Sequence, residues 1–138
     1  MKNEDARRIL DAARAEAVKM QKNVTIIVVD AGGAPMMLER MDGATGMTAM
    51  VAEGKAVGSA FTGRDSVLNR TMAENNPAMV AVVSARLGGR FMPVQGAVVM
   101  RRDGEVMGAC GVSGATSEED EQIAKAGIAA VDGGQALR

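Results

Sequence analysis

The sequence predicts an α+β fold, an antiparallel sheet with helices packed on it, formed by residues 1–138 as a single domain. Two β-hairpins, at residues 24–41 and 97–112, support this prediction, as does the helical spacing of apolar residues around them. The order helix, hairpin, helices, hairpin, helix is typical of an antiparallel sheet and not of a parallel doubly wound one. A chain of 138 residues can bury a core without disulfides or metal.

The first hairpin follows a predicted helix over residues 3–21, in which Ile9, Ala13 and Ala17 share one apolar stripe. Residues 23–29 are rich in β-branched side chains, residues 31–35 contain the turn, and residues 36–41 resume an extended pattern. Because the strand is apolar on both sides, it is expected at the centre of the sheet, with cover on both faces.

The longest central helix is predicted over residues 46–61. One stripe carries its larger apolar side chains together with Gly54 and Gly58. The spacing of these two glycines favours close packing with another backbone, with a second subunit as one candidate. The stripe consists of Met47, Met50, Val51, Gly54, Val57, Gly58 and Phe61. A polar segment over residues 65–75 is predicted to contain helix and loop.

Local signals place the remaining elements. Asn76-Pro77 is a favoured start for a helix that Gly88-Gly89 ends. Asp103-Gly104 predicts a type I′ turn in the second hairpin. Thr116 and Glu119 have the spacing of a capping box for a last helix over residues 116–131, which Asp132-Gly-Gly134 is expected to end.

The charge balance argues against nucleic acid and anionic membranes as partners. The chain has 16 basic and 17 acidic residues, spread along its length. We interpret it as a cytoplasmic protein, since Glu4 and Asp5 interrupt the apolar core that a signal peptide needs, and no segment reaches the ~18 apolar residues of a membrane span. The single cysteine, Cys110, fits a reducing compartment and is expected to be a buried, inert thiol.

The absence of His, Tyr and Trp limits the chemistry more sharply. Histidine-based catalytic triads and histidine-ligated zinc or haem are excluded, and no metal site is predicted. Acid or base catalysis would require Asp, Glu, Lys, Arg, Cys or water. The 12 methionines are interpreted as core filling rather than as soft-metal ligands.

The segment Gly108-Ala-Cys-Gly-Val-Ser-Gly114 is predicted to join a strand to the last helix. It lacks the lysine and glycine register of a phosphate loop, and Ala115 stands where a nucleophile elbow around Ser113 would need glycine. Free amides at the start of the helix could bind an anion beside Ser113, although capping by Thr116 and Glu119 is favoured.

Two groups of residues are candidates for ligand contact. Arg40, Asp42 and Lys55 could hold an anionic group beside an apolar cavity, or could equally form a salt-bridged joint between strand and helix. Arg90 and Phe91 lie in a long loop that could line or cover a pocket, although burial of Phe91 in the core is an equally ordinary outcome.

Nearly the whole chain resembles the GlcG/HbpS-like family, which includes the C-terminal domain of PduO. The matching segments are Val28-Val-Asp-Ala-Gly-Gly33, Arg40-Met-Asp-Gly-Ala44, Lys55, Gln95-Gly96, Asp103-Gly-Glu-Val-Met-Gly-Ala-Cys-Gly-Val-Ser-Gly114 and Asp120-Glu121. The resemblance implies a five-stranded antiparallel sheet flanked by helices and a homo-oligomer. Some relatives bind or handle haem, and others accompany glycolate or corrinoid metabolism.

This chain departs from the family pattern at two features. Gly96-Ala-Val-Val99 replaces the usual Gly-Gly-x-Pro, which predicts regular strand near the presumed pocket. The absence of histidine removes the iron ligand that some relatives use, so haem is a less favoured candidate. If haem binds, its iron would have to be ligated by Met, Cys, Thr, Lys or a carboxylate.

Three functional hypotheses follow. The leading one is an oligomeric protein that binds a small molecule, haem or another anionic organic ligand, through Arg40, Asp42, Lys55, Arg90, Phe91 and Ser113. The alternative is a cofactor-independent lyase or isomerase acting on a small organic acid, in which Asp42 or Lys55 transfers a proton. The third is a scaffold role that rests on assembly alone.

Overall fold

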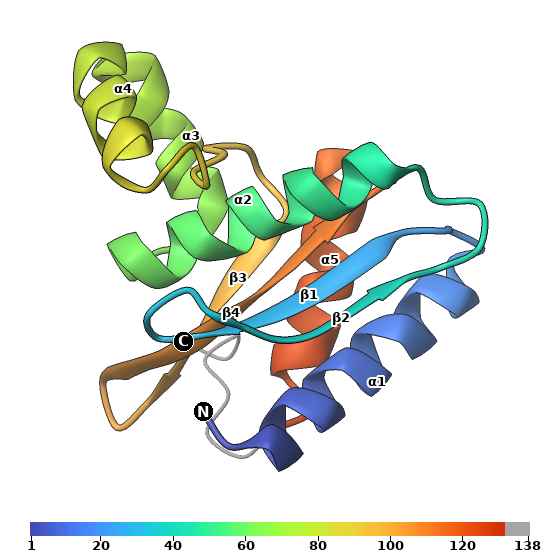
Figure 1. Cartoon of the computed structure of the whole chain (residues 1–138). Coiled ribbons are helices and arrows are strands. Elements are labelled where there is room, and N and C mark those ends of the chain that lie inside the picture. The colour runs from blue at the N-terminus through green and yellow to red at the C-terminus, as the bar shows by residue number, and fades with distance from the viewer. Residues whose placement is uncertain (132–138) are drawn as a thin grey trace.

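A computed structural model of the chain describes residues 1–131, which form an α+β fold. Figure 1 shows a twisted sheet with α1 and α5 on one face and α2 on the other, while α3 and α4 extend beyond the end of α2. In chain order the elements are α1 (Asn3–Lys19), β1 (Thr25–Asp30), β2 (Pro35–Arg40), α2 (Gly46–Thr62), α3 (Ser66–Asn75), α4 (Pro77–Arg86), β3 (Ala97–Arg102), β4 (Glu105–Ser113) and α5 (Ser117–Ile128).

The sheet has the order β2-β1-β4-β3, and every neighbouring pair is antiparallel. β1 is therefore an interior strand, and residues 25–29 are all buried, as its apolar sequence predicts. Both predicted hairpins are present. Asp103 and Gly104 have φ angles of 54° and 80°, the positive values that a type I′ turn requires at both central positions.

The expectation of five strands is wrong, because the described residues form a four-stranded sheet. Side chains occupy the outer edge of β3, where another strand would pair. The amide of Ala97 donates to Ser66 Oγ at 2.8 Å, and the amide of Val99 donates to Asp65 Oδ1 at 3.0 Å. The start of α3 thus takes backbone donors that a further strand would use.

Asp65→Asn tests the cost of this arrangement. Burial raises the pKa of the Asp65 carboxyl, and the hydrogen bond from Val99 opposes the shift only in part. A raised folded-state pKa means that the wild type loses stability as pH rises from the unfolded value of about 3.9 through the folded value. Urea unfolding at several pH values from 4 to 7 should show the variant gaining stability relative to the wild type over that window. If the difference in unfolding free energy between the variant and the wild type is the same at every pH, the raised pKa of Asp65 is contradicted.

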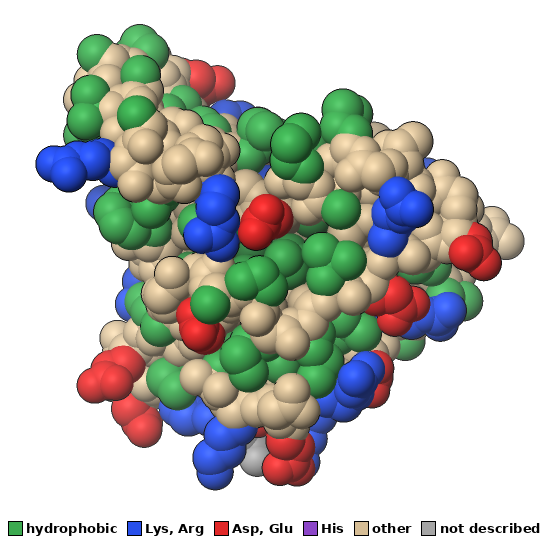
Figure 2. All heavy atoms as spheres, viewed as in Figure 1, with side chains coloured by type: hydrophobic (Ala, Val, Ile, Leu, Met, Phe, Trp, Pro, Cys, Tyr) green, Lys and Arg blue, Asp and Glu red, His purple; other side chains and the backbone are tan. Residues whose placement is uncertain are grey.

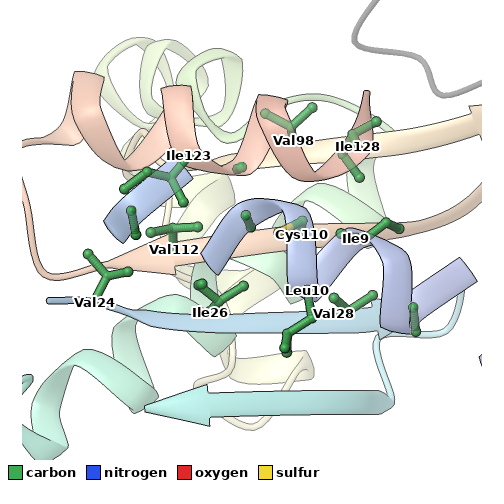
Figure 3. Packing of buried hydrophobic residues seen from close by; sticks show 14 of the residues in the cluster. Ile9, Leu10, Val24, Ile26, Val28, Val98, Cys110, Val112, Ile123 and Ile128 are labelled. Carbon is green, nitrogen blue, oxygen red and sulfur yellow. The ribbon is translucent and has the colours of Figure 1, made fainter. Parts of the chain in front are cut away.

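The main core lies between the sheet and the pair α1 and α5. Figure 3 shows Ile9 and Leu10 from α1 and Ile123 and Ile128 from α5 pointing toward the strands. They meet a continuous layer of side chains from Val24, just before β1, and from the strands, namely Ile26, Val28, Val98, Met100, Cys110 and Val112. Burial of this apolar surface supplies the main driving force for folding.

The opposite face is covered by α2 at unusually short range. Ala52, Ala56 and Ala60 pack against Ile27, Val29 and Ala109 of the sheet. Directly below the helix lies Gly111, where an added Cβ atom would come within 2.4 Å of the Ala52 carbonyl oxygen. Small side chains on both layers therefore allow the backbone of α2 to approach β4 closely.

The predicted apolar stripe of α2 does not form its sheet-facing side. Met47, Met50 and Phe61 are 66%, 64% and 60% exposed. Gly54 and Gly58 pack against Met92 and Phe91 of the same chain, so this glycine pair makes a contact within the subunit. The side of α2 that faces the sheet consists of small residues, which are only weakly hydrophobic, so the spacing of apolar residues does not identify it as the buried side.

Several terminal signals are confirmed. Asn76 accepts a hydrogen bond from the Met79 amide, with Pro77 at the start of α4. Thr116 and Glu119 form the reciprocal capping box of α5. The helix ends at Ile128 rather than at residue 131, and the predicted end signal Asp132-Gly-Gly134 lies outside the described residues. Within residues 1–131 we find no helix long and apolar enough to cross a membrane.

Candidate functional site

The predicted ligand residues lie at three separate places along α2. Arg40 and Asp42 are exposed beside its N-terminus, whereas Lys55 is buried near its middle. Arg90 and Phe91 lie over its second half, in the loop before β3. Among the described residues, no hydrogen bond or ion pair joins Arg40 or Asp42 to Lys55. The candidates therefore form a surface group at Arg40, an internal group at Lys55 and a loop group at Arg90 and Phe91.

Lys55 forms the internal group. Its side chain is 3% exposed, and its ammonium donates to the Val112 carbonyl oxygen at 2.9 Å and to Asp120 Oδ2 at 3.1 Å. The other carboxylate oxygen of Asp120 accepts from the Ala115 amide at 3.0 Å. Because α2 and α5 cover opposite faces, this ion pair joins the two layers past the start of β3.

Gly96 makes the space for this ion pair. An added Cβ atom would lie 2.6 Å from Lys55 Nζ and 3.0 Å from the Val112 carbonyl oxygen. Burial raises the pKa of the Asp120 carboxyl, while the Lys55 ammonium and the Ala115 amide oppose the shift. Such a buried pair fits a structural clamp, because the ammonium is already engaged and shielded from solvent.

A second polar chain lies beside the clamp. Gln95 donates through Nε2 to Glu121 and accepts from Arg70 at 3.2 Å, and Lys125 pairs with the other oxygen of Glu121 at 3.3 Å. These contacts fix the end of the loop that precedes β3 against α3 and α5. The two adjacent carboxylates of α5, at Asp120 and Glu121, thus each have a cationic partner.

Ser113 lies at the end of β4 and is 8% exposed. It stands in register with Thr25, which in turn stands in register with Arg40 on β2. Three of the amides that follow Ser113 are occupied, since Ala115 donates to Asp120, Thr116 donates to Glu119, and Glu119 donates to Thr116. This end of β4 therefore has the hydrogen bonds of the favoured capping arrangement.

The loop carrying Arg90 and Phe91 is held against the body of the protein. Arg90 donates to the Gly33 carbonyl oxygen at 2.7 Å and pairs with Glu53 at 3.5 Å. The ring of Phe91 lies against Gly58 and is 4% exposed. Of the two interpretations of Phe91, burial is the one found.

Arg40 forms the surface group with the N-terminal turns of α2. An added Cβ atom on Gly46 would lie 3.2 Å from Arg40 Nη1, so the guanidinium lies over the first residue of the helix. Thr45, the N-cap, makes no side-chain capping bond. The guanidinium therefore lies at the positive end of the helix. Met47 and Met50 are exposed in the first turns of the same helix, and Met50 lies one turn after Gly46 on the same side. We call Arg40, Gly46, Met47 and Met50 the Arg40 patch.

The side chains that could ligate haem iron differ in their accessibility. Cys110 is fully buried, and burial raises the pKa of its thiol to about 12. Lys55 is engaged with Asp120. The thioethers of Met47 and Met50 are exposed, and methionine sulfur is an established axial ligand of haem iron. No cavity for a ligand was found among the described residues.

The sequence pattern of a family described as "Haem degrading protein HbpS-like" matches residues 1–129. The chain belongs to this HbpS-like family. The protein GlcG of Escherichia coli K12 is 34% identical over 105 residues, which cover 76% of this chain and 75% of that protein. The corrinoid adenosyltransferase PduO of Citrobacter freundii is 29% identical over 88% of this chain, which spans only 36% of that relative.

Solved structures of the HbpS-like family share this fold. A crystal structure described as a PduOC:heme complex has a TM-score of 0.86 and 26% identity, with 96% of this chain and 95% of that chain covered. A double mutant of HbpS from Streptomyces reticuli has a TM-score of 0.85 and 24% identity, with 96% and 87% covered. The second likeness supports the fold, and the first also connects a member of the family with haem.

Sequence reasoning did not identify Asp120 as the partner of Lys55, nor Met47 and Met50 as exposed residues. One signal for the first was available, since Lys55 is the one basic residue of residues 46–62 and a buried ammonium requires an acidic partner. The two methionines were assigned to the core because their spacing matched an apolar stripe.

Proposed function

We propose that this member of the HbpS-like family binds a small anionic organic ligand, with haem as the first candidate, at the Arg40 patch. The observation that carries the proposal is the likeness to the PduOC:heme complex over 96% of the chain at 26% identity. The family description supports it, since it names a haem-degrading protein. Haem combines a flat apolar ring with propionates, so it needs both an apolar surface and a cation.

The residues of the Arg40 patch supply both. Arg40 would pair with a propionate at the positive end of α2, and Met47 and Met50 would contact the ring or the iron through sulfur. When bound, the haem would supply redox-active iron. Arg90 and Ser113 stay candidates for contact with a ligand, whereas the ion pair of Lys55 with Asp120 supports a structural role for that lysine.

A haemin titration followed by Soret absorbance tests this proposal. The wild type should give a saturable, shifted band. Arg40→Ala should weaken binding about two- to fivefold, the effect of one exposed charge pair. Met47→Leu with Met50→Leu keeps the apolar contact and removes both sulfurs, so the band should move toward that of free haemin if sulfur ligates the iron.

Two variants control for general effects of charge and methionine loss. Arg86→Ala removes an exposed arginine of α4, and Met79→Leu removes an exposed methionine of the same helix. Both should bind haemin like the wild type. A wild-type spectrum indistinguishable from that of free haemin, or an unchanged affinity in Arg40→Ala, would refute haem binding at this patch.

The proposed functional unit is a homo-oligomer, and α4 supports this part of the proposal. The helix is almost entirely apolar, carries a charge only at Arg86, and buries none of its residues within the chain. Figure 2 shows hydrophobic side chains over α4 and along the outer side of α2. A helix that is apolar around its circumference is normally covered, and a second copy presents a surface of the same chemistry.

Val82→Asp should therefore reduce the oligomer to a smaller species in light scattering coupled to size exclusion. Val82 is 62% exposed in the single chain, so the substitution should leave the fold unchanged, while a buried, unpaired carboxylate would oppose assembly. Asn75→Asp, which adds the same charge at an exposed position of α3, is the matched control. A wild type that is monomeric at all concentrations would contradict this proposal.

No specific observation favours the alternative of a lyase or isomerase. Asp42 is exposed on the connection before α2, and the Lys55 ammonium is committed to Asp120. Proton transfer by these two groups stays a prediction from the sequence.

A further inference from the structure

Asn69 on α3 is a buried amide without a partner. Its side chain is 1% exposed, and neither Nδ2 nor Oδ1 has a hydrogen-bond partner within the described residues. Burying an unsatisfied polar group costs about 1–3 kcal/mol, and this side chain leaves a donor and an acceptor unsatisfied together. The assignment of nitrogen and oxygen is immaterial, because both atoms are unpartnered.

The amide lies beside an aromatic ring. An added Cβ atom on Gly58 would lie 3.5 Å from Asn69 Nδ2 and 2.7 Å from two atoms of the Phe91 ring. The amide and the ring therefore meet above Gly58, where the helix has no side chain. Phe91 belongs to the loop before β3, and the hydroxyl of the next residue of α2, Ser59, is also buried and unpartnered.

From this arrangement we propose that Asn69 is a ligand-recognition residue whose site is closed by Phe91, and that its ligand carries a planar cyclic amide. Asn69 offers a donor and an acceptor side by side. A lactam presents the complementary acceptor and donor along one edge, so it would satisfy both atoms at once. The flat surface over Gly58, which already accepts an aromatic ring, would accept a flat heterocycle when Phe91 moves away.

The site is distinct from the Arg40 patch. Asn69 and Gly58 lie toward the α3 end of α2, whereas Arg40 lies over Gly46 at the start of the same helix. The inference therefore does not rest on haem binding. A weak contact between the Asn69 amide and the Phe91 ring is the competing explanation, in which Asn69 has only a structural role.

Titration of the ¹⁵N-labelled wild type with 2-pyrrolidinone tests the proposal. The side-chain amide signals of Asn69, assigned by their loss in Asn69→Leu, and the backbone amide of Gly58 should shift saturably. N-methyl-2-pyrrolidinone has nearly the same shape but no N–H donor, so it should give no saturable shift at these positions. Equal responses to both compounds, or no saturable response to either, would overturn the proposal.

Two variants locate the site and its cover. Phe91→Ala should bind 2-pyrrolidinone at least about tenfold more tightly, because the apparent affinity falls with the fraction of open protein. Asn69→Leu should abolish binding while its thermal stability stays equal or rises, since it removes an unsatisfied amide. Binding that persists in Asn69→Leu would overturn the proposal. If Phe91→Ala fails to fold, the wild-type titration and Asn69→Leu still decide it.

Discussion

Lys55→Met should lower the free energy of unfolding by about 3–5 kcal/mol, the effect of removing one partner of a buried ion pair. Methionine has nearly the length of lysine, so the loss would come from charge and not from volume. The Asp120 side chain is 3% exposed, and without Lys55 the Ala115 amide would be the one remaining hydrogen-bond donor to its carboxylate within residues 1–131. The variant should also show a further rise in the pKa of Asp120, because its cation is gone.

Urea unfolding at pH 7 measures this loss, and two further variants interpret it. Lys55→Met combined with Asp120→Asn removes both charges and keeps an acceptor for the Ala115 amide, so it should recover part of the stability. Lys19→Met replaces a lysine whose side chain is 78% exposed, and it should change stability by less than about 1 kcal/mol. A loss in Lys55→Met no larger than that in Lys19→Met would exclude the clamp.

Gly111→Ala should destabilise the fold by about 3 kcal/mol, at the upper end of the usual cost of overpacking. The added methyl group would lie 2.4 Å from the Ala52 carbonyl oxygen and 2.9 Å from the Ala56 Cβ atom. A backbone oxygen cannot rotate away as a side chain can, so the whole of α2 would have to lift from β4. That movement would open the contacts of α2 with Ile27 and Val29 as well.

Thermal unfolding of Gly111→Ala measures this cost. Gly32→Ala is the matched control, because an added Cβ atom there meets only Asp30 Oδ1, at 3.5 Å, and the residue is exposed. The control should change stability by less than about 0.5 kcal/mol. A Gly111→Ala variant as stable as the control would show that α2 can move at little cost, against the close packing described above.

Haemin binding and the free energy of unfolding should be changed by different variants. Lys55→Met and Gly111→Ala act on the packing between layers, whereas Arg40→Ala removes an exposed guanidinium that supports none of these layers. A loss of haemin binding in Arg40→Ala with unchanged unfolding would therefore separate ligand contact from structure. The same logic separates Asn69→Leu, which should lose lactam binding without losing stability.

The sequence by itself determined the hairpins and most helix starts, because those signals are local. Asp103-Gly104 sets its turn through two positive φ angles, and Thr116 caps α5 through a residue three positions away. The fifth strand implied by family resemblance was wrong, because Asp65 and Ser66 occupy the edge where it would pair. That edge is blocked by residues more than 30 positions away, which no local pattern reveals.

The tertiary structure alone decided which candidate residues meet. Arg40, Asp42 and Lys55 lie within 16 residues of one another in the chain. Arg40 lies over Gly46, and Lys55 lies more than two helical turns further along α2, where it pairs with the buried Asp120. Small residues let α2 approach the sheet, so the side carrying Met47, Met50 and Phe61 faces outward. Spacing identifies an apolar side of a helix, but only the packing distance between layers determines which side is buried.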